Sequence, residues 1–94
     1  MGDELIRAAA HECAEAKSND RWARAFFESG NDEMGKLSVR HAHYHRLAAL
    51  ALRQVAAEIE CERDGFSPDA EKRLHAAQDA MRKAMAPTGA EVKS

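Results

Sequence analysis

Two histidines near the middle of the chain have the spacing that metal binding requires. His41 and His45 are four residues apart, so on a helix both imidazoles point to one side and can bind the same ion. No Cys-x-x-Cys or His-Glu-x-x-His motif accompanies them, and His11 or a cysteine could complete a site only through a tertiary contact. We therefore interpret the pair as helix or interface histidines and assign no metal ligand. A metal-binding helical bundle is kept as an alternative.

A third histidine lies near two carboxylates. His75 is four residues from both Glu71 and Asp79, which allows ion pairs along a helix surface and resembles the arrangement of a general acid or base held by a carboxylate. However, the chain contains no Walker motif, Gly-x-Ser-x-Gly motif or EF-hand loop that would supply a nucleophile or a phosphate site. We therefore interpret His75 as part of a solvated helix face, and we expect no catalytic residue, no enzymatic activity and no cofactor.

The central part of the chain carries positive charge without any acidic residue. Residues 34–57 contain no Asp or Glu. Basic side chains of this kind contact phosphates or an acidic protein surface. The whole chain has a net charge of -2, whereas dedicated nucleic-acid domains are strongly basic. We therefore expect an acidic protein partner, with a nucleic-acid-associated regulator as the alternative. The candidate partner-binding residues in this segment are Lys36, Arg40, His43, Arg46 and Arg53.

Trp22 is a further candidate for partner binding. It lies between Arg21 and Arg24, and Trp and Arg are both enriched among the residues that dominate interface energetics. The competing interpretation is that Trp22, Phe26 and neighbouring Phe27 are core residues, because large aromatic side chains are mostly buried.

The first third of the chain has a helical pattern with a polar interruption. Asp3 is expected near the start, where acidic residues favour the positive end of the helix dipole. Residues 18–20 are Ser, Asn and Asp, which cap helices better than they continue them. We therefore predict a short separate helical segment around Trp22, with one continuous helix as the alternative. Gly30 suits the left-handed position that ends a helix. The predicted apolar stripe contains Leu5, Ile6, Ala9, Cys13 and Ala16.

A long central helix is predicted over residues 33–63, with Gly65 as its C-terminal stop. Two separate apolar stripes are expected on it, although a surface helix needs only one. Two stripes indicate burial on two sides, either between helices of one chain or against a second subunit. The main stripe contains Leu37, His41, Tyr44, Ala48, Ala51, Leu52, Val55 and Ile59. The second contains Val39, His43, Leu47, Leu50, Ala57 and Cys61.

The order of charges along this helix favours an antiparallel homodimer. Its first half is positive, whereas Glu58, Glu60, Glu62 and Asp64 cluster near its end. Antiparallel pairing of two copies places each positive half beside the other's negative half. The second stripe supplies the predicted dimer interface, which consists of Val39, Leu47, Leu50 and Ala57.

The last helix has the clearest start signals. Ser67 is a good N-cap residue and Pro68 suits the first helical position. Pro87 is expected to end this helix, and residues 88–94 are expected to form a flexible tail. The domain prediction is therefore a single helical domain over residues 1–87 followed by a tail over residues 88–94.

Composition supports an all-α fold with a thin core. Alanine supplies 20 of the 94 residues and aromatic residues only 5%, so helices are favoured but little apolar area is available, which is a reason to expect a partner. Cys13 and Cys61 are expected to be reduced and to pack as small apolar residues. No apolar run is long enough to span a membrane and no signal peptide is evident, so a cytoplasmic protein without membrane contact is expected.

The combined prediction is a small all-α bundle of three main helices plus a short helical segment, with a long central helix and an antiparallel dimer. The expected function is non-enzymatic protein binding. Size and the lack of catalytic motifs also fit accessory or phage-type proteins that inhibit a larger complex, anti-CRISPR proteins among them.

Overall fold

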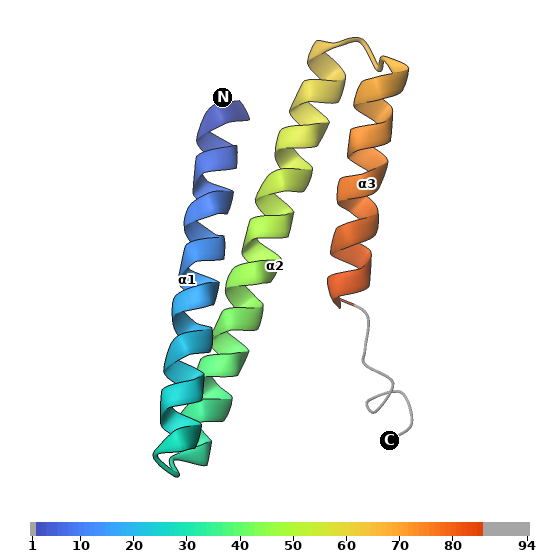
Figure 1. Cartoon of the computed structure of the whole chain (residues 1–94). Coiled ribbons are helices and arrows are strands. Elements are labelled where there is room, and N and C mark those ends of the chain that lie inside the picture. The colour runs from blue at the N-terminus through green and yellow to red at the C-terminus, as the bar shows by residue number, and fades with distance from the viewer. Residues whose placement is uncertain (1, 86–94) are drawn as a thin grey trace, which may run out of the picture.

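The computed structural model describes residues 2–85, and these form three helices connected by two short turns. The helices are α1 (Gly2–Glu28), α2 (Asp32–Arg63) and α3 (Pro68–Met85). The described residues contain no strand, so the predicted all-α class is confirmed. Consecutive helices run antiparallel, with α2 between α1 and α3 (Figure 1). The predicted helix end at Pro87 and the predicted tail lie outside the described residues.

The first turn is built from one glycine and one asparagine. Gly30 has a φ of 85°, and the Asn31 amide donates a 2.8 Å hydrogen bond to the Phe26 carbonyl, which is the 6→1 bond of a Schellman motif. The Asn31 side chain then accepts a hydrogen bond from the Met34 amide at 3.3 Å. Asn31 therefore completes the end of α1 and caps the start of α2, which confirms the predicted helix end at Gly30.

The second turn repeats this motif. Gly65 has a φ of 65° and the Phe66 amide donates a 2.8 Å hydrogen bond to the Cys61 carbonyl. The Ser67 hydroxyl accepts a hydrogen bond from the Ala70 amide at 3.3 Å, and Pro68 is the first residue of α3. The predicted stop and the predicted N-cap are thus both confirmed.

The prediction of a separate helical segment around Trp22 is wrong, because α1 runs without a break from Gly2 to Glu28. Residues 18–20 are half-buried within this helix. The Asn19 side-chain amide donates to the Glu15 carbonyl at 2.9 Å, and the Asp20 carboxylate pairs with Arg46 of α2. Contacts within α1 and with α2 therefore hold these polar residues in a helix that their own propensity disfavours.

Small residues form the interface between α1 and α2. Residues seven apart lie on nearly the same side of a helix, and the interface uses one such row on each helix. Small side chains allow two helix axes to approach closely, so this contact is tight although it contains little apolar area. The buried rows are Ala9, Ala16 and Ala23 on α1, and Gly35, Ala42, Ala49 and Ala56 on α2.

The predicted main stripe of α2 is therefore not its buried face. Tyr44 of that stripe is 56% exposed and Val55 is 43% exposed, whereas the buried row contains only Gly and Ala. On α1, Ile6 of the predicted stripe is also exposed, at 52%. Ranking helix faces by large apolar residues misses an interface in which close backbone approach, rather than side-chain volume, governs packing.

The three helices form one layer. Within residues 2–85, α1 and α3 make no contact with each other, and they lie on opposite sides of α2 (Figure 1). The Cα trace extends over 54 × 33 × 13 Å, and its radius of gyration of 16.3 Å exceeds the value of about 12 Å expected for a compact domain of this length. No common core closes around all three helices, so both faces of the layer are open.

Helix α3 packs against the C-terminal half of α2 (Figure 1). Arg73 of α3 forms an ion pair with Glu60 of α2, and Cys61 and Ala70 are buried. Burial raises the pKa of the Cys61 thiol, and nearby carboxylates, Glu71 foremost, raise it further. None of the helices described is both long and apolar enough to cross a membrane.

Candidate functional site

The predicted basic residues divide into two groups on different flanks of α2. Lys36, Arg40 and His43 are exposed on the N-terminal half of α2. Arg40 is in the same seven-residue row as Leu47 and Cys61, so it belongs to the flank on which α3 packs. We call Lys36, Arg40 and His43 the cationic edge.

No helix among residues 2–85 covers the cationic edge, because α3 accompanies only the second half of α2 (Figure 1). Within residues 2–85, neither Lys36 nor Arg40 forms an ion pair with a carboxylate. Further along α2, the Glu60 carboxylate pairs with Arg73 of α3. The N-terminal half of α2 therefore presents the positive charges of Lys36 and Arg40 without a carboxylate partner among residues 2–85.

Arg46 and Arg53 belong instead to the interface with α1. The Arg46 guanidinium pairs with Asp20, and Arg53 Nη2 lies 3.5 Å from Cys13 Sγ. They line a groove of about 290 Å³ between α1 and α2. Its complete lining is Cys13, Ala16, Lys17, Arg46, Ala49, Leu50 and Arg53. The structure thus does not unite the five predicted basic residues into one surface.

Trp22 is 60% exposed, so the interpretation that it is a core residue is wrong. Its ring centroid lies 6.1 Å from that of Phe26, which is half-buried on the same helix. This contact orients the indole without covering it. The proposed role of Trp22 as an anchor for a partner stays a prediction.

The residues of the predicted dimer interface have mixed environments. Val39 is exposed, whereas Leu47, Leu50 and Ala57 are half-buried in the single chain. Leu50 lines the groove next to α1. Part of the second stripe is therefore used within one chain, which is one of the two explanations that the sequence left open.

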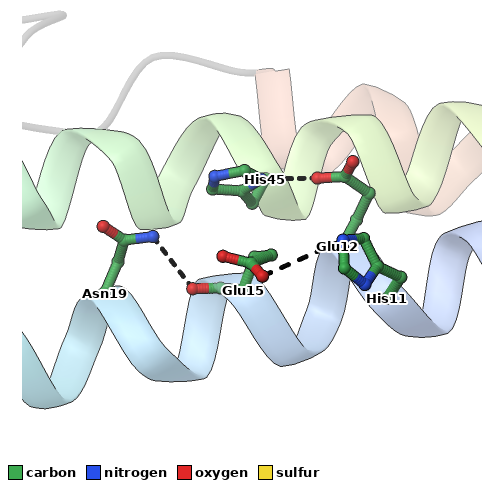
Figure 2. A network of polar contacts seen from close by, with 5 residues as sticks. All are labelled: His11, Glu12, Glu15, Asn19 and His45. Carbon is green, nitrogen blue, oxygen red and sulfur yellow. Dashed lines mark hydrogen bonds and ion pairs between the residues drawn. The ribbon is translucent and has the colours of Figure 1, made fainter.

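The histidine pair is divided between solvent and the interface with α1. His41 is exposed, whereas His45 Nδ1 lies 2.5 Å from Glu12 Oε2 across the interface. Figure 2 shows this contact beside the pair formed by His11 and Glu15 on α1, 3.8 Å apart. Among residues 2–85 there is no group of three or more His, Cys, Asp or Glu residues placed to hold a metal ion.

His75 is exposed on α3, and its expected partner Asp79 is engaged elsewhere. Lys83 Nζ lies 3.1 Å from Asp79 Oδ2, and Arg82 pairs with the other oxygen. Hydrogen bonds from these two side chains hold the pKa of Asp79 below its usual value. The two cysteines are free, with Cys13 half-buried and Cys61 buried.

An exposed apolar row on α2 is the feature that the sequence interpretation assigned incorrectly. Its members alternate at spacings of three and four residues, as the contact positions of a coiled coil do. Besides Tyr44 and Val55, its end residues Met34 and Leu37 are 39% and 36% exposed. In the sequence, the small residues Gly35, Ala42, Ala49 and Ala56 recur every seven positions. This repeat was the signal that the buried face of α2 is the one with small residues. We call the apolar row the exposed seam, although its two alanines are half-buried: Met34, Leu37, His41, Tyr44, Ala48, Ala51 and Val55.

Comparison with protein-family models, curated proteins and solved structures finds no match to this chain. The surface of the molecule is therefore the basis on which its function is argued.

Proposed function

We propose that the protein is a non-enzymatic binding module that holds an acidic, helical segment of another protein against the cationic edge. The observation that carries the proposal is that α3, described from Pro68 to Met85, does not reach Lys36, Arg40 and His43. The flank of α2 on which α3 packs thus continues into an open, positively charged end.

A helix is the partner that suits this flank. The edge residues are spaced at four and three positions, which is the spacing of side chains on one helix face. Two exposed apolar side chains are available to such a partner. Val39 lies between Lys36 and Arg40 on α2, and Met85 is the last residue of α3. Leu47 is half-buried in the same row as Arg40. A partner helix that carries acidic residues and at least one apolar residue could contact both kinds of side chain.

The charges contribute mainly to selectivity and association rate. Each exposed ion pair contributes only about 0.2–1 kcal/mol, so apolar contacts must supply much of the affinity. Nucleic acid is a weaker candidate for the same edge. Two permanent positive charges would neutralise few phosphates, and the carboxylates of Glu58 and Glu62 on the same helix would repel the backbone.

Fluorescence anisotropy with a labelled synthetic peptide tests the proposal. The peptide is an amphipathic helix with glutamates at successive turns, measured at low and at moderate salt. The double variant Lys36→Glu/Arg40→Glu should weaken peptide binding about tenfold or more, because two attractive contacts become repulsive. The matched control Arg7→Glu/Lys72→Glu makes the same change in net charge at exposed positions elsewhere and should bind the peptide as the wild type does.

Two results would contradict the proposal. One is equal loss of binding in the control, since attraction would then come from overall charge. The other is that wild-type protein ignores the peptide at low salt but binds labelled duplex DNA, with an affinity that falls steeply as salt rises. That second result would favour the nucleic-acid alternative.

A further inference from the structure

The exposed seam of α2 has the pattern of a helix contact, but neither of the other two helices described within residues 2–85 packs along its length. α1 occupies the rows of small residues and α3 occupies a different flank. Contact positions at alternating spacings of three and four residues extend from Met34 to Val55. The larger side chains of the seam are exposed, Ala48 and Ala51 are half-buried, and the described layer, 13 Å thick, has no second layer on this face.

We infer that this seam is the contact surface of an antiparallel homodimer, in which the α2 helices of two copies pack face to face. The occupant that the seam fits is therefore a second copy of this chain. The dimer uses another side of α2 than the cationic edge does, so it is independent of the proposed binding of an acidic partner.

The order of side-chain sizes along the seam is self-complementary. If the two-fold axis passes at the level of residue 46, Tyr44 faces the partner subunit's Ala48 and His41 faces the partner subunit's Ala51. The two ring side chains then each meet an alanine, Leu37 meets the partner subunit's Val55, and by symmetry the same contacts form twice. In a parallel pairing, Tyr44 would face the partner subunit's Tyr44, and the alanines would face each other across a gap that costs packing energy.

The order of charges selects the same direction. The seam contains no carboxylate between Met34 and Val55, and its next two positions are Glu58 and Glu62. Parallel pairing would place Glu58 against the partner subunit's Glu58, which is unfavourable. Antiparallel pairing separates the two Glu58 side chains and places each opposite the partner subunit's Met34.

The available surface is large enough for a stable contact. The seam spans residues 34–55, which is about 33 Å at 1.5 Å per residue, and the layer is about 20 Å wide over α1 and α2 at ordinary helix spacing. The resulting footprint of about 650 Å² approaches the roughly 800 Å² per partner that is typical of specific interfaces. Stacking two layers would also convert two open faces into one closed core.

Solution mass measured by light scattering over a range of concentrations is the first test. We expect the wild type to reach twice the 10.4 kDa of one chain. Val55→Glu should remain at the mass of one chain with unchanged helical circular dichroism, because Val55 is already 43% exposed and a glutamate there disturbs no core. The matched control is Val39→Glu, which places the same charge on an equally exposed valine of another row and should remain dimeric.

Directed disulfide formation tests the register. In a background in which Cys13 and Cys61 are replaced by alanine, a chain with Tyr44→Cys is mixed with a chain with Ala48→Cys. Antiparallel packing should give mainly the mixed disulfide, whereas parallel packing should give mainly Tyr44→Cys chains linked to each other.

Three outcomes would overturn the inference. The first is a wild type that keeps the mass of one chain up to about 100 μM, a concentration at which even micromolar association is visible. The others are a monomeric Val39→Glu variant beside a dimeric Val55→Glu variant, or cross-links that are predominantly parallel. Peptide binding by Val55→Glu, measured in parallel, distinguishes failure of the dimer from failure of the proposed partner site.

Discussion

His45 Nδ1 lies 2.5 Å from Glu12 Oε2, and this contact joins α1 to α2 in the middle of their interface (Figure 2). Seven residues along α2 from His45, in the same row, is Leu52, and seven residues along α1 from Glu12 is Leu5. Each member of the polar pair thus has one apolar neighbour in its row, and the other neighbours, Ser38 and Asn19, are polar. Such a layer can specify the register of two helices at some cost in stability.

Removing one member of this pair should destabilise the packing of α1 against α2. Glu12→Ala leaves the half-buried His45 without its acceptor, and we expect the free energy of unfolding to fall by about 1 kcal/mol. The double variant Glu12→Leu/His45→Leu should recover this loss, because the apolar pair needs no desolvation of polar groups. Urea unfolding followed by circular dichroism measures both. A Glu12→Ala variant as stable as the wild type would show that the contact contributes nothing.

Gly35 should resist replacement because of Phe27. A Cβ atom at residue 35 would lie 2.6 to 2.7 Å from three ring carbons of Phe27, so Gly35→Ala must displace the ring. In the wild type we expect this displacement to cancel or exceed the gain of about 1 kcal/mol that alanine has over glycine in a helix. In a Phe27→Ala background the same substitution should stabilise the protein. Thermal unfolding of the wild type, the two single variants and the double variant gives the coupling energy between residues 27 and 35. An equal effect of Gly35→Ala in both backgrounds would exclude a steric cause.

The rows of small residues should not accept a larger side chain. Ala49→Leu inserts three carbon atoms between α1 and α2, and we expect a loss of about 1–3 kcal/mol in the free energy of unfolding. Ala25→Leu makes the same chemical change at an exposed position of α1 and should alter stability by less than about 0.5 kcal/mol. Denaturant unfolding compares the two, and similar losses in both would mean that the helices are not closely packed.

The two thiols should differ in reactivity. Cys61 is buried and its pKa is raised above the ordinary value of 9.0, whereas Cys13 is half-buried beside the groove. At neutral pH, maleimide should label Cys13 first and should reach Cys61 at a rate close to that of protein unfolding. Mass spectrometry of digested, time-sampled protein identifies the labelled site. Equal labelling rates in the native protein would contradict the burial of Cys61.

The raised pKa of Cys61 also has a consequence for stability at alkaline pH. Because the folded state favours the neutral thiol, this contribution to stability is complete below the unfolded pKa of about 9 and is lost as pH rises through the folded value. Cys61→Ala should therefore reduce the decline of the unfolding midpoint above about pH 9. Chemical unfolding at neutral and alkaline pH compares this variant with the wild type, and an identical alkaline decline would exclude a role for the thiol.

Helix boundaries were predictable because the signals that set them are local. Gly30 and Gly65 take left-handed conformations that few other residues adopt without strain, and Ser67 caps α3 with its own hydroxyl. Each of these contacts lies within one or two turns of the residue that makes it. The break predicted at residues 18–20 did not form, because the competing contact, between Asp20 and Arg46, connects residues far apart in the chain.

Local chemistry therefore decides where the three helices begin and end, whereas the tertiary structure decides which side of α2 each neighbour covers. The positive segment was visible in the sequence, but its division into an open cationic edge and two arginines at the α1 interface depends on where α1 and α3 lie against α2. The buried face of α2 was not visible from residue types, because glycine and alanine bury little area individually. They become the core only when a second helix with its own small residues approaches closely enough for dispersion contacts to accumulate along both backbones.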